Sequence, residues 1–284
     1  MGGRICMVTG ASSGIGKATA LELARLGATV ILVCRDRSKG ESVIDEIRRK
    51  YSDVNVDLLL ADLLSLDSVS AAANQYLEKY EHLHVLVNNA GAFFMKRRVT
   101  ADGIERSFAV NYLSHFLLTN LLLDVLKQSA PARIVNMTGS HHSKATINFD
   151  DLQLERHYSG SHAIAHSKLA EILFTYELAR RLEGTGVTAN CLHPGVVATE
   201  FVDKAEDFPT VIKYIYRLAK PFMKSPLEGA ETVIYLATSP KAEGVTGKYY
   251  VNKKVIESSP ESYDTDVAGR LWDVSLALTG LDTQ

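Results

Sequence analysis

Short apolar runs rich in β-branched residues alternate along the chain with longer stretches in which apolar residues recur at helical spacing. The short runs predict strands, and they lie at 4–10, 28–35, 56–62, 83–91, 132–139, 187–195 and 247–252. The longer stretches predict helices, and they lie at 16–27, 39–52, 66–80, 104–129, 162–184 and 228–239.

This alternation predicts right-handed strand–helix–strand units and a parallel sheet with helices on both faces. The chain has 284 residues and shows no internal repeat, low-complexity segment or linker. A length of this order fits one large domain. We therefore predict an α/β protein: a single Rossmann-type, doubly wound domain that spans residues 1–284.

Residues 200–226 interrupt the alternation as an insertion. Basic residues stand among apolar residues at near-helical spacing, which predicts an amphipathic helix. Such a helix packs one face on the domain, or it forms a lid over a substrate pocket and contacts a membrane surface. The apolar residues are Val211, Ile212, Ile215, Leu218 and Ala219, and the basic ones are Lys213, Arg217, Lys220 and Lys224.

Composition narrows the function classes. Hydrophobic residues make up 46% and charged residues 23%, which is ordinary for a globular protein with a substantial core. The net charge of −2 gives no basic field, so we expect no nucleic-acid partner. The cysteines Cys6, Cys34 and Cys191 form no CxxC or Cys/His cluster. Their separation argues against a disulfide framework or a metal site and fits a reducing compartment.

The start of the chain, MGGRICMVTG, lacks the pattern of a signal peptide. No run approaches the roughly 20 apolar residues that span a bilayer. We therefore expect a cytoplasmic protein without a transmembrane segment.

A glycine-rich turn, VTGASSGIG at 8–16, follows the first predicted strand and opens the first predicted helix. Gly10 permits the tight turn, and Gly14 and Gly16 let backbone amides approach a pyrophosphate at the helix N-terminus. The strand–loop–helix context favours dinucleotide binding.

The G-x-x-x-G-x-G spacing of this turn resembles that of the short-chain dehydrogenase/reductase family. NNAG at 88–91, the segment NYLSHFLLT from Asn111, and HPGVVAT at 193–199 match further motifs of that family in order. ILVCRD, SKLAEILFTYELARRL and SPLEGAETVIYLA resemble its retinol-dehydrogenase-like branch. The resemblance implies an oxidoreductase that acts on small apolar alcohols or carbonyls with a nicotinamide cofactor.

The resemblance also implies which residues contact this cofactor. The loop 8–16 would hold the pyrophosphate, and three later strand ends would hold the adenine, ribose and nicotinamide. In that order the implied residues are Gly10, Ser12, Ser13, Gly14, Ile15 and Gly16; Asp62 and Leu63; Asn89, Ala90 and Gly91; and Pro194, Gly195, Val197 and Thr199.

The end of the second predicted strand bears on cofactor choice. An NAD-binding protein of this class places a carboxylate there to bind the ribose hydroxyls. Here Cys34 stands at that position, and Arg35 follows it and is suited to pair with a 2′-phosphate. In the alternative, Asp36 binds the ribose and Arg35 is solvated. We predict NADP(H).

The family uses an asparagine, a serine, a tyrosine and a lysine for catalysis. By resemblance, the tyrosine exchanges a proton with the substrate oxygen, and the lysine lowers the tyrosine's pKa and holds the ribose. Asn111 and Lys168 match two members of this tetrad. The tyrosine position falls on Ile164 and the serine position on Gly139. Both proton-handling groups are missing, so we expect the family's reaction to be impaired.

Neighbouring side chains offer substitutes. Ser140 is adjacent to Gly139, and His141 or His142 would bring an imidazole to the same loop. Lys168 is itself a candidate reactive amine beside Ile164. Tyr158, His162 and His166 are weaker candidates, because Tyr158 precedes the helix and the histidines point roughly 200° around it from Ile164.

Three functions remain open at this point: an impaired NADP(H)-dependent oxidoreductase, a protein that binds NADP(H) or an apolar ligand without turnover, and a repurposed site. Dimers and tetramers are common in the family, so a homo-oligomer is compatible with the resemblance. The residues themselves do not decide the oligomeric state.

Overall fold

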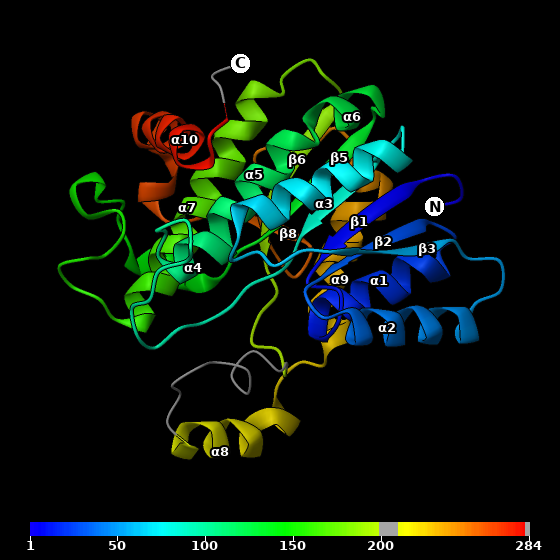
Figure 1. Cartoon of the computed structure of the whole chain (residues 1–284), viewed down its shortest axis with the longest axis horizontal. Coiled ribbons are helices and arrows are strands. Elements are labelled where there is room, and N and C mark those ends of the chain that lie inside the picture. The colour runs from blue at the N-terminus through cyan, green and yellow to red at the C-terminus, as the bar shows by residue number, and fades with distance from the viewer. Residues whose placement is uncertain (199–209, 282–284) are drawn as a thin grey trace.

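The computed structural model describes residues 1–198 and 210–281. Within these residues, one sheet of eight strands runs in the order β3-β2-β1-β4-β5-β6-β7-β8 (Figure 1). All neighbouring strands are parallel except β7 and β8, which are antiparallel. The strands are β1 (Ile5–Thr9), β2 (Thr29–Cys34), β3 (Val56–Leu60), β4 (Val85–Asn88), β5 (Ala132–Met137), β6 (Val187–His193), β7 (Tyr249–Val251) and β8 (Lys254–Ile256).

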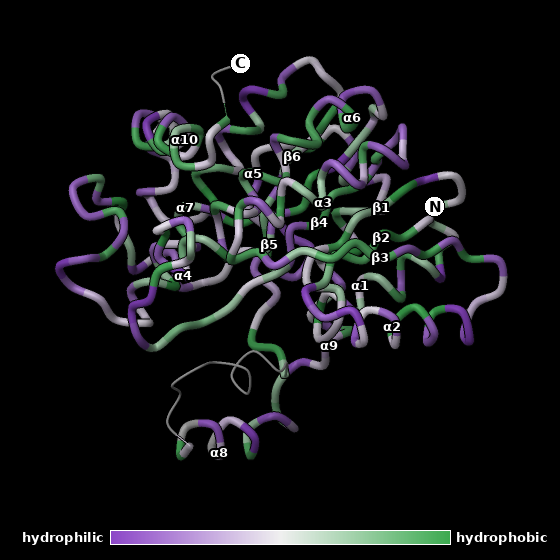
Figure 2. Tube along the Cα trace, viewed as in Figure 1, coloured by the Kyte–Doolittle hydropathy of each residue, from purple (hydrophilic) through white to green (hydrophobic). Residues whose placement is uncertain are grey.

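The central strands read as continuous apolar runs because helices cover both faces of the sheet. In β2, every residue after Thr29 is buried. Figure 2 shows the strands as largely hydrophobic, whereas outer helices such as α2 alternate. The helices are α1 (Gly14–Arg25), α2 (Arg37–Lys50), α3 (Leu66–Lys79), α4 (Arg106–Phe108), α5 (Ser114–Leu121), α6 (Leu123–Gln128), α7 (Gly160–Arg181), α8 (Thr210–Ala219), α9 (Pro226–Thr238) and α10 (Thr265–Thr279).

The two faces of the sheet have separate cores. Helices α1, α2 and α9 contribute to one apolar cluster, and α3, α5, α7 and α10 contribute to the other. In the second cluster, the Phe116 and Trp272 rings meet edge to face with their centroids 5.0 Å apart. Phe174 of α7 packs against both rings, so three helices share one aromatic contact.

Polar side chains fix where several helices begin. The Asp36 carboxylate accepts a hydrogen bond from the Lys39 amide at the start of α2. Ser65 and Ser159 cap α3 and α7 in the same way, and Ser225 forms a capping box with Glu228 at α9.

The α/β fold and all seven expected strands are confirmed. The expected long helix over 104–129 is wrong, because a π-helical turn at Ala109–Leu113 and a break at Leu122 divide it. The edge strand β8 and the C-terminal helix α10 are present but were not predicted from the sequence.

The insertion contains a helix, α8, as expected. Of the two alternatives for its apolar side, packing on the domain does not apply to Val211 and Leu218, which are 69% and 60% exposed. Among the described residues, no helix combines the length and apolar character needed to cross a bilayer.

Candidate active site

The strand order reverses between β1 and β4, which makes this point the switch point of the sheet. In doubly wound sheets, ligands bind in the crevice outside the carboxyl ends of the strands at that point. Gly10 and Asn89 follow the two switch-point strands, and Gly139 and Pro194 follow β5 and β6. The fold therefore brings four of the predicted motifs to one edge.

The ends of β1 and β4 are tied together by Thr9. Its hydroxyl oxygen accepts hydrogen bonds from the Asn89 and Ala90 amides at 2.9 and 3.0 Å. The Asn89 side chain donates in return to the Thr9 carbonyl at 2.8 Å. These three hydrogen bonds hold the NNAG segment beside the glycine-rich turn.

The glycines of the turn are required by its geometry. Gly10 and Gly14 have φ of +66° and +56°, in the left-handed region. A Cβ on Gly16 would collide with the Gly10 carbonyl and lie 2.5 Å from Asn89 Nδ2. The turn leads directly into α1, whose first amides have no acceptor within the helix. These residues fit a pyrophosphate group.

Three consecutive residues at the end of β2 differ in their surroundings. Cys34 is buried and Arg35 is exposed. The Asp36 carboxylate is engaged at the N-terminus of α2, where it accepts from the Lys39 amide at 3.1 Å. The loop after β3 is fixed as well, since the Asp62 carboxylate accepts from the Leu64 amide at 3.1 Å.

The loop after β6 approaches α1 closely. Gly195 has φ of +90°, and a Cβ on Gly229 of α9 would lie 2.8 Å from Val197 and 3.1 Å from Ile15. Gly229 thus allows Val197 to pack near the glycine-rich turn. Thr199 lies outside the described residues.

Asn111 sits in the π-helical turn, a local feature frequent at functional sites. Its carboxamide accepts from the Ala92 amide at 2.9 Å and donates to the Ala92 carbonyl at 3.0 Å. It also reaches the Ser167 hydroxyl on α7 at 3.4 Å. Asn111 therefore links the segment after β4 to the helix that carries Lys168.

Lys168 is buried, with 7% of its surface exposed. Its amine donates to the Met137 carbonyl at 2.8 Å, and its own carbonyl accepts from the Thr138 hydroxyl at 2.9 Å. Burial lowers the pKa of Lys168 to about 8, although the nearby Glu171 opposes the shift. The end of β5 and the first half of α7 are joined at this residue.

The two positions expected to carry proton-handling groups are apolar and buried. Ile164 lies one turn before Lys168 on α7 and is 5% exposed. A Cβ on Gly139 would lie 3.8 Å from Lys168 Cγ and 3.9 Å from His141 Nδ1. Both are ordinary contact distances, so the backbone has room for a serine there.

The substitute groups differ in their surroundings. Ser140 and His141 are exposed, whereas Gly139 and His142 are buried. His142 Nδ1 pairs with the Gly139 carbonyl at 2.7 Å and its Nε2 accepts from the Ser259 amide at 3.1 Å, so both ring nitrogens are engaged. His141 Nδ1, at 3.9 Å, is the histidine nitrogen nearest to the point that a Cβ on residue 139 would occupy. Burial, and then Lys144 and Lys168, lower the pKa of His141.

The remaining candidates are engaged elsewhere. The Tyr158 hydroxyl donates to the Phe94 carbonyl at 2.9 Å, and burial raises its pKa to about 12. His166 is buried, and the centroids of its ring and the Phe108 ring are 5.5 Å apart. Burial lowers the pKa of His166 to about 4. His162 is exposed at the start of α7.

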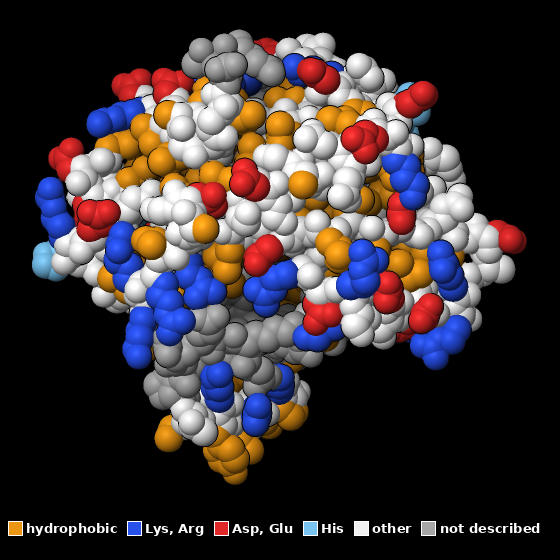
Figure 3. Space-filling model, viewed as in Figure 1, with side chains coloured by type: hydrophobic (Ala, Val, Ile, Leu, Met, Phe, Trp, Pro, Cys, Tyr) orange, Lys and Arg blue, Asp and Glu red, His pale blue; other side chains and the backbone are white. Residues whose placement is uncertain are grey.

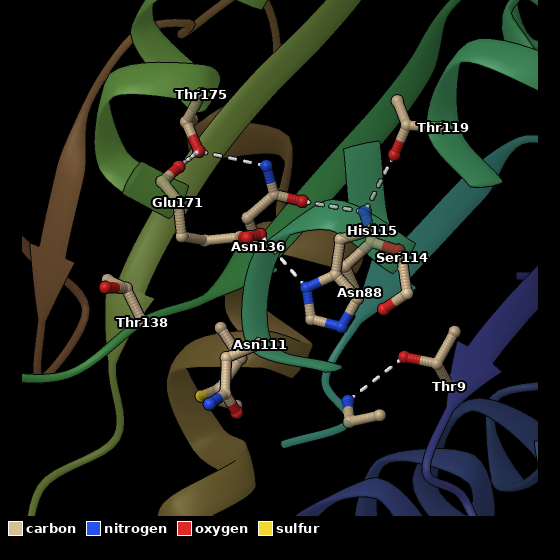
Figure 4. A network of polar contacts seen from close by, with 12 residues as sticks. Thr9, Asn88, Asn111, Ser114, His115, Thr119, Asn136, Thr138, Glu171 and Thr175 are labelled. Atoms are coloured by element: carbon tan, nitrogen blue, oxygen red, sulfur yellow. Dashed lines mark hydrogen bonds and ion pairs between the residues drawn. The ribbon is translucent and has the colours of Figure 1, made fainter. Parts of the chain in front are cut away.

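A network of buried polar side chains, which the sequence did not predict, lies behind the site (Figure 4). Asn88 Nδ2 donates to Thr119 and to Asn136 Oδ1, both at 2.9 Å, and Asn136 Nδ2 donates to Thr175 at 2.9 Å. Beside it, His115 Nδ1 pairs with Glu171 Oε1 at 3.2 Å, and both side chains are fully buried. The available signal was the isolated polar residue within otherwise apolar strands.

The match to known sequences is extensive. A family model described as short chain dehydrogenase covers residues 4–209. The chain belongs to the short-chain dehydrogenase/reductase family. This membership confirms the resemblance and places the chain in an oxidoreductase family that uses NAD(P)(H).

The curated relatives belong to the retinol-dehydrogenase-like branch. Human retinol dehydrogenase 14 is 46% identical over 295 residues, covering 99% of this chain and 88% of that protein. Human retinol dehydrogenase 12 is 45% identical over 279 residues, covering 98% and 87%. The similarity extends through the insertion and α10, beyond the family-model match.

Solved structures share the fold. A putative uncharacterized protein from Mycobacterium paratuberculosis aligns with a TM-score of 0.80 and 31% identity, covering 100% of this chain and 96% of that one. A putative NAD(P)-dependent gluconate 5-dehydrogenase from Beutenbergia cavernae, with bound NADP, aligns with a TM-score of 0.70 and 26% identity, covering 88% and 94%.

Gly16 provides a test of the cofactor turn in this short-chain dehydrogenase/reductase. Because a Cβ there has no room, we expect Gly16→Ala to lower the free energy of unfolding by about 2 kcal/mol and to weaken NADPH binding at least about tenfold. Urea unfolding and NADPH fluorescence titration measure the two effects.

Gly269→Ala is the matched control, because no heavy atom lies within 4 Å of a Cβ at that position in α10. We expect this change to raise stability by up to about 1 kcal/mol. Equal NADPH affinity in Gly16→Ala and the parent chain would contradict the assignment of the turn.

Proposed function

We propose that this chain binds NADP(H) and acts on small apolar alcohols or carbonyls with an impaired proton-transfer step. The observation that carries the proposal is the contrast within one site. Asn111 and Lys168 are held by specific hydrogen bonds, while Ile164 and Gly139 offer no group that handles a proton. A bound nicotinamide cofactor would supply or accept the hydride.

The chain's own residues would bind this cofactor along the crevice. The turn at 10–16 would hold the pyrophosphate, and Asn89, Ala90 and Gly91 would lie along the ribose. Lys168 would hold the ribose hydroxyls with its amine, which already points to the end of β5. Pro194, Gly195 and Val197 would contact the nicotinamide.

The expected NADP(H) preference rests on the end of β2. Asp36 caps α2 with its carboxylate, and Arg35, the preceding residue, is exposed. A guanidinium binds a phosphate through paired, charge-assisted hydrogen bonds. The apolar substrate class rests on the relatives, several of which are named retinol dehydrogenases.

His141 is the chain's own candidate for residual proton transfer. Its Nδ1 lies within 3.9 Å of the position that a Cβ on Gly139 would occupy. An imidazole there would donate a proton in carbonyl reduction and accept one in alcohol oxidation. Ser140 and His141 are both exposed on this loop, so the choice of His141 rests on the position of its Nδ1.

A second candidate function is binding of NADP(H) or an apolar ligand without turnover. It is favoured by Ile164, which is buried and offers no anchor for a water that would replace the tyrosine hydroxyl. The two functions predict the same cofactor affinity and differ only in turnover.

The deciding experiment is NADPH titration by fluorescence, followed by turnover with apolar aldehydes and ketones, in the parent chain and in Ile164→Tyr/Gly139→Ser. A positioned acid contributes about 10²–10⁴-fold. We therefore expect the double variant to raise kcat at least about 10²-fold with NADPH affinity little changed.

Ile164→Phe/Gly139→Ser is the matched control, because it adds the ring without the hydroxyl. It should bind NADPH and show no comparable gain. NADPH binding with no gain in the tyrosine variant would rule out the proposed alignment of the site, and turnover near family levels in the parent chain would rule out the impairment.

Cofactor choice is tested by Arg35→Ala. We expect NADPH affinity to fall about tenfold while NADH affinity stays the same, because only NADPH carries the 2′-phosphate. Arg37→Ala, which removes an exposed arginine 3.5 Å from Glu41, is the control. Unchanged NADPH affinity in Arg35→Ala would argue for NAD(H).

The role of His141 is tested by pH. Because its pKa lies below the usual 6.5, the imidazole is neutral at pH 7 and becomes an acid only at lower pH. Residual carbonyl reduction should therefore rise as pH falls through 6.5 and below, and His141→Gln should abolish that rise. His162→Gln, at an exposed position, should leave it intact. An unchanged profile in His141→Gln would exclude this residue as the donor.

A further inference from the structure

Helix α8 projects from the body of the protein beyond the carboxyl edge of the sheet (Figure 1). It spans Thr210–Ala219 and continues into a 3₁₀ turn at Lys220–Phe222. This arrangement leaves one side of the helix open to its surroundings.

The open side of α8 is apolar. Val211, Tyr214, Leu218 and Phe222 are 69%, 63%, 60% and 92% exposed. The spacing of three and four residues places Val211, Tyr214 and Leu218 along one stripe of α8, and Phe222 lies in the 3₁₀ turn that follows it. We call these four side chains the apolar face of α8. Isolated exposed apolar residues are common, but a contiguous stripe of this size marks an interaction site.

Basic residues accompany this face. Between 210 and 224 the chain has Lys213, Arg217, Lys220 and Lys224 and no acidic residue, although its overall net charge is −2. Figure 3 shows hydrophobic side chains at the free tip of this region, with Lys and Arg beside them. An amphipathic helix with aromatic and leucine residues on one side and lysine and arginine on the other is typical of helices that lie in a membrane interface.

We propose that the apolar face of α8 docks into the surface of an anionic lipid bilayer. Val211, Tyr214, Leu218 and Phe222 enter the boundary between headgroups and acyl chains. Lys213, Arg217 and Lys220 lie at headgroup level, where each cation is attracted by anionic lipids.

A second copy of this chain fits the face less well. A ten-residue helix is about 15 Å long, and a stable interface buries about 800 Å² on each partner. A projecting tip supplies less than that, whereas it enters a bilayer surface without needing a complementary cavity.

The docking face is tied to the crevice. The Tyr216 hydroxyl donates to the Val197 carbonyl at 3.3 Å. The Lys224 backbone pairs with Val196 and Ala198 at 3.1 and 2.9 Å, and its amine donates to the Asn252 side chain at 2.7 Å. Docking therefore holds the mouth of the crevice at the membrane. That this serves entry of an apolar substrate rests on the proposed function, whereas the docking itself does not.

The test is cosedimentation of the full chain with vesicles of phosphatidylcholine, alone or with about 30% phosphatidylserine. We expect binding to the mixed vesicles, at least about fivefold weaker binding to pure phosphatidylcholine, and weakening at about 0.5 M salt. Equal binding to both vesicles would overturn the anionic preference, and no binding to either would overturn the proposal.

Leu218→Ser/Phe222→Ser removes two exposed side chains of the face. We expect its partition coefficient to fall about 100-fold, because each of the two large apolar side chains contributes about tenfold. Leu77→Ser/Val255→Ser is the matched control, since these residues are 44% and 52% exposed outside α8. It should bind vesicles within about twofold of the parent chain.

NADPH titration of the same variants separates this proposal from the proposed function. Unchanged NADPH affinity in Leu218→Ser/Phe222→Ser shows that the fold is intact and assigns lost vesicle binding to the face. Equal loss in both double variants would overturn the proposal. So would a concentration-dependent dimer of the parent chain that Leu218→Ser/Phe222→Ser abolishes, because it would assign the face to a second copy.

Discussion

Buried hydrogen bonds between strand and helix side chains hold the site in place. Asn88 of β4 and Asn136 of β5 bond to each other, and each also bonds to a threonine, on α5 and α7 respectively (Figure 4). Leaving one such amide unpaired in the core costs more free energy than the bond itself contributes. The relative positions of two strands and two helices are therefore strongly specified. Asn111 precedes α5 and Lys168 lies on α7, so both inherit their positions from this network.

This arrangement separates the scaffold from the chemistry. The hydrogen bonds that position Asn111 and Lys168 go to backbone groups and to Ser167, and none goes to residue 139 or 164. Isoleucine at 164 adds to a buried apolar surface, and glycine at 139 leaves an ordinary contact distance to its neighbours. The contacts of Asn111 and Lys168 thus do not depend on which side chains stand at 139 and 164. The low pKa of Lys168 follows from burial, and the same burial keeps its amine directed at Met137.

The sequence predicted those features that have a local physical signature. Strands buried on both faces read as continuous apolar runs, and the nucleotide turn needs glycines that no other residue replaces at φ of +66°. The network was not predictable in this way, because one asparagine in an apolar strand does not say which element it faces. The π-helical turn at Asn111 likewise leaves the helical spacing of 104–129 nearly unchanged. For α8, periodicity identified the amphipathic helix but not whether Val211 and Leu218 face the core or the surroundings.

The loop after β6 contacts both the proposed nucleotide site and the base of α8, which carries the proposed docking face. Val197 and Ile15 of the glycine-rich turn both pack against Gly229, and the Val197 carbonyl accepts a hydrogen bond from Tyr216 of α8. Gly229 makes this possible, since any larger residue would displace Val197. A cofactor that restrains Val197 would therefore also restrain Tyr216 of α8. A membrane surface that binds α8 would in turn restrain Val197. If either ligand binds one arrangement of Val197 better than another, the two binding free energies are coupled by the same amount in both directions. The proposed nucleotide site and the proposed docking face would thus share one element, the segment around Val197, rather than act as two independent sites.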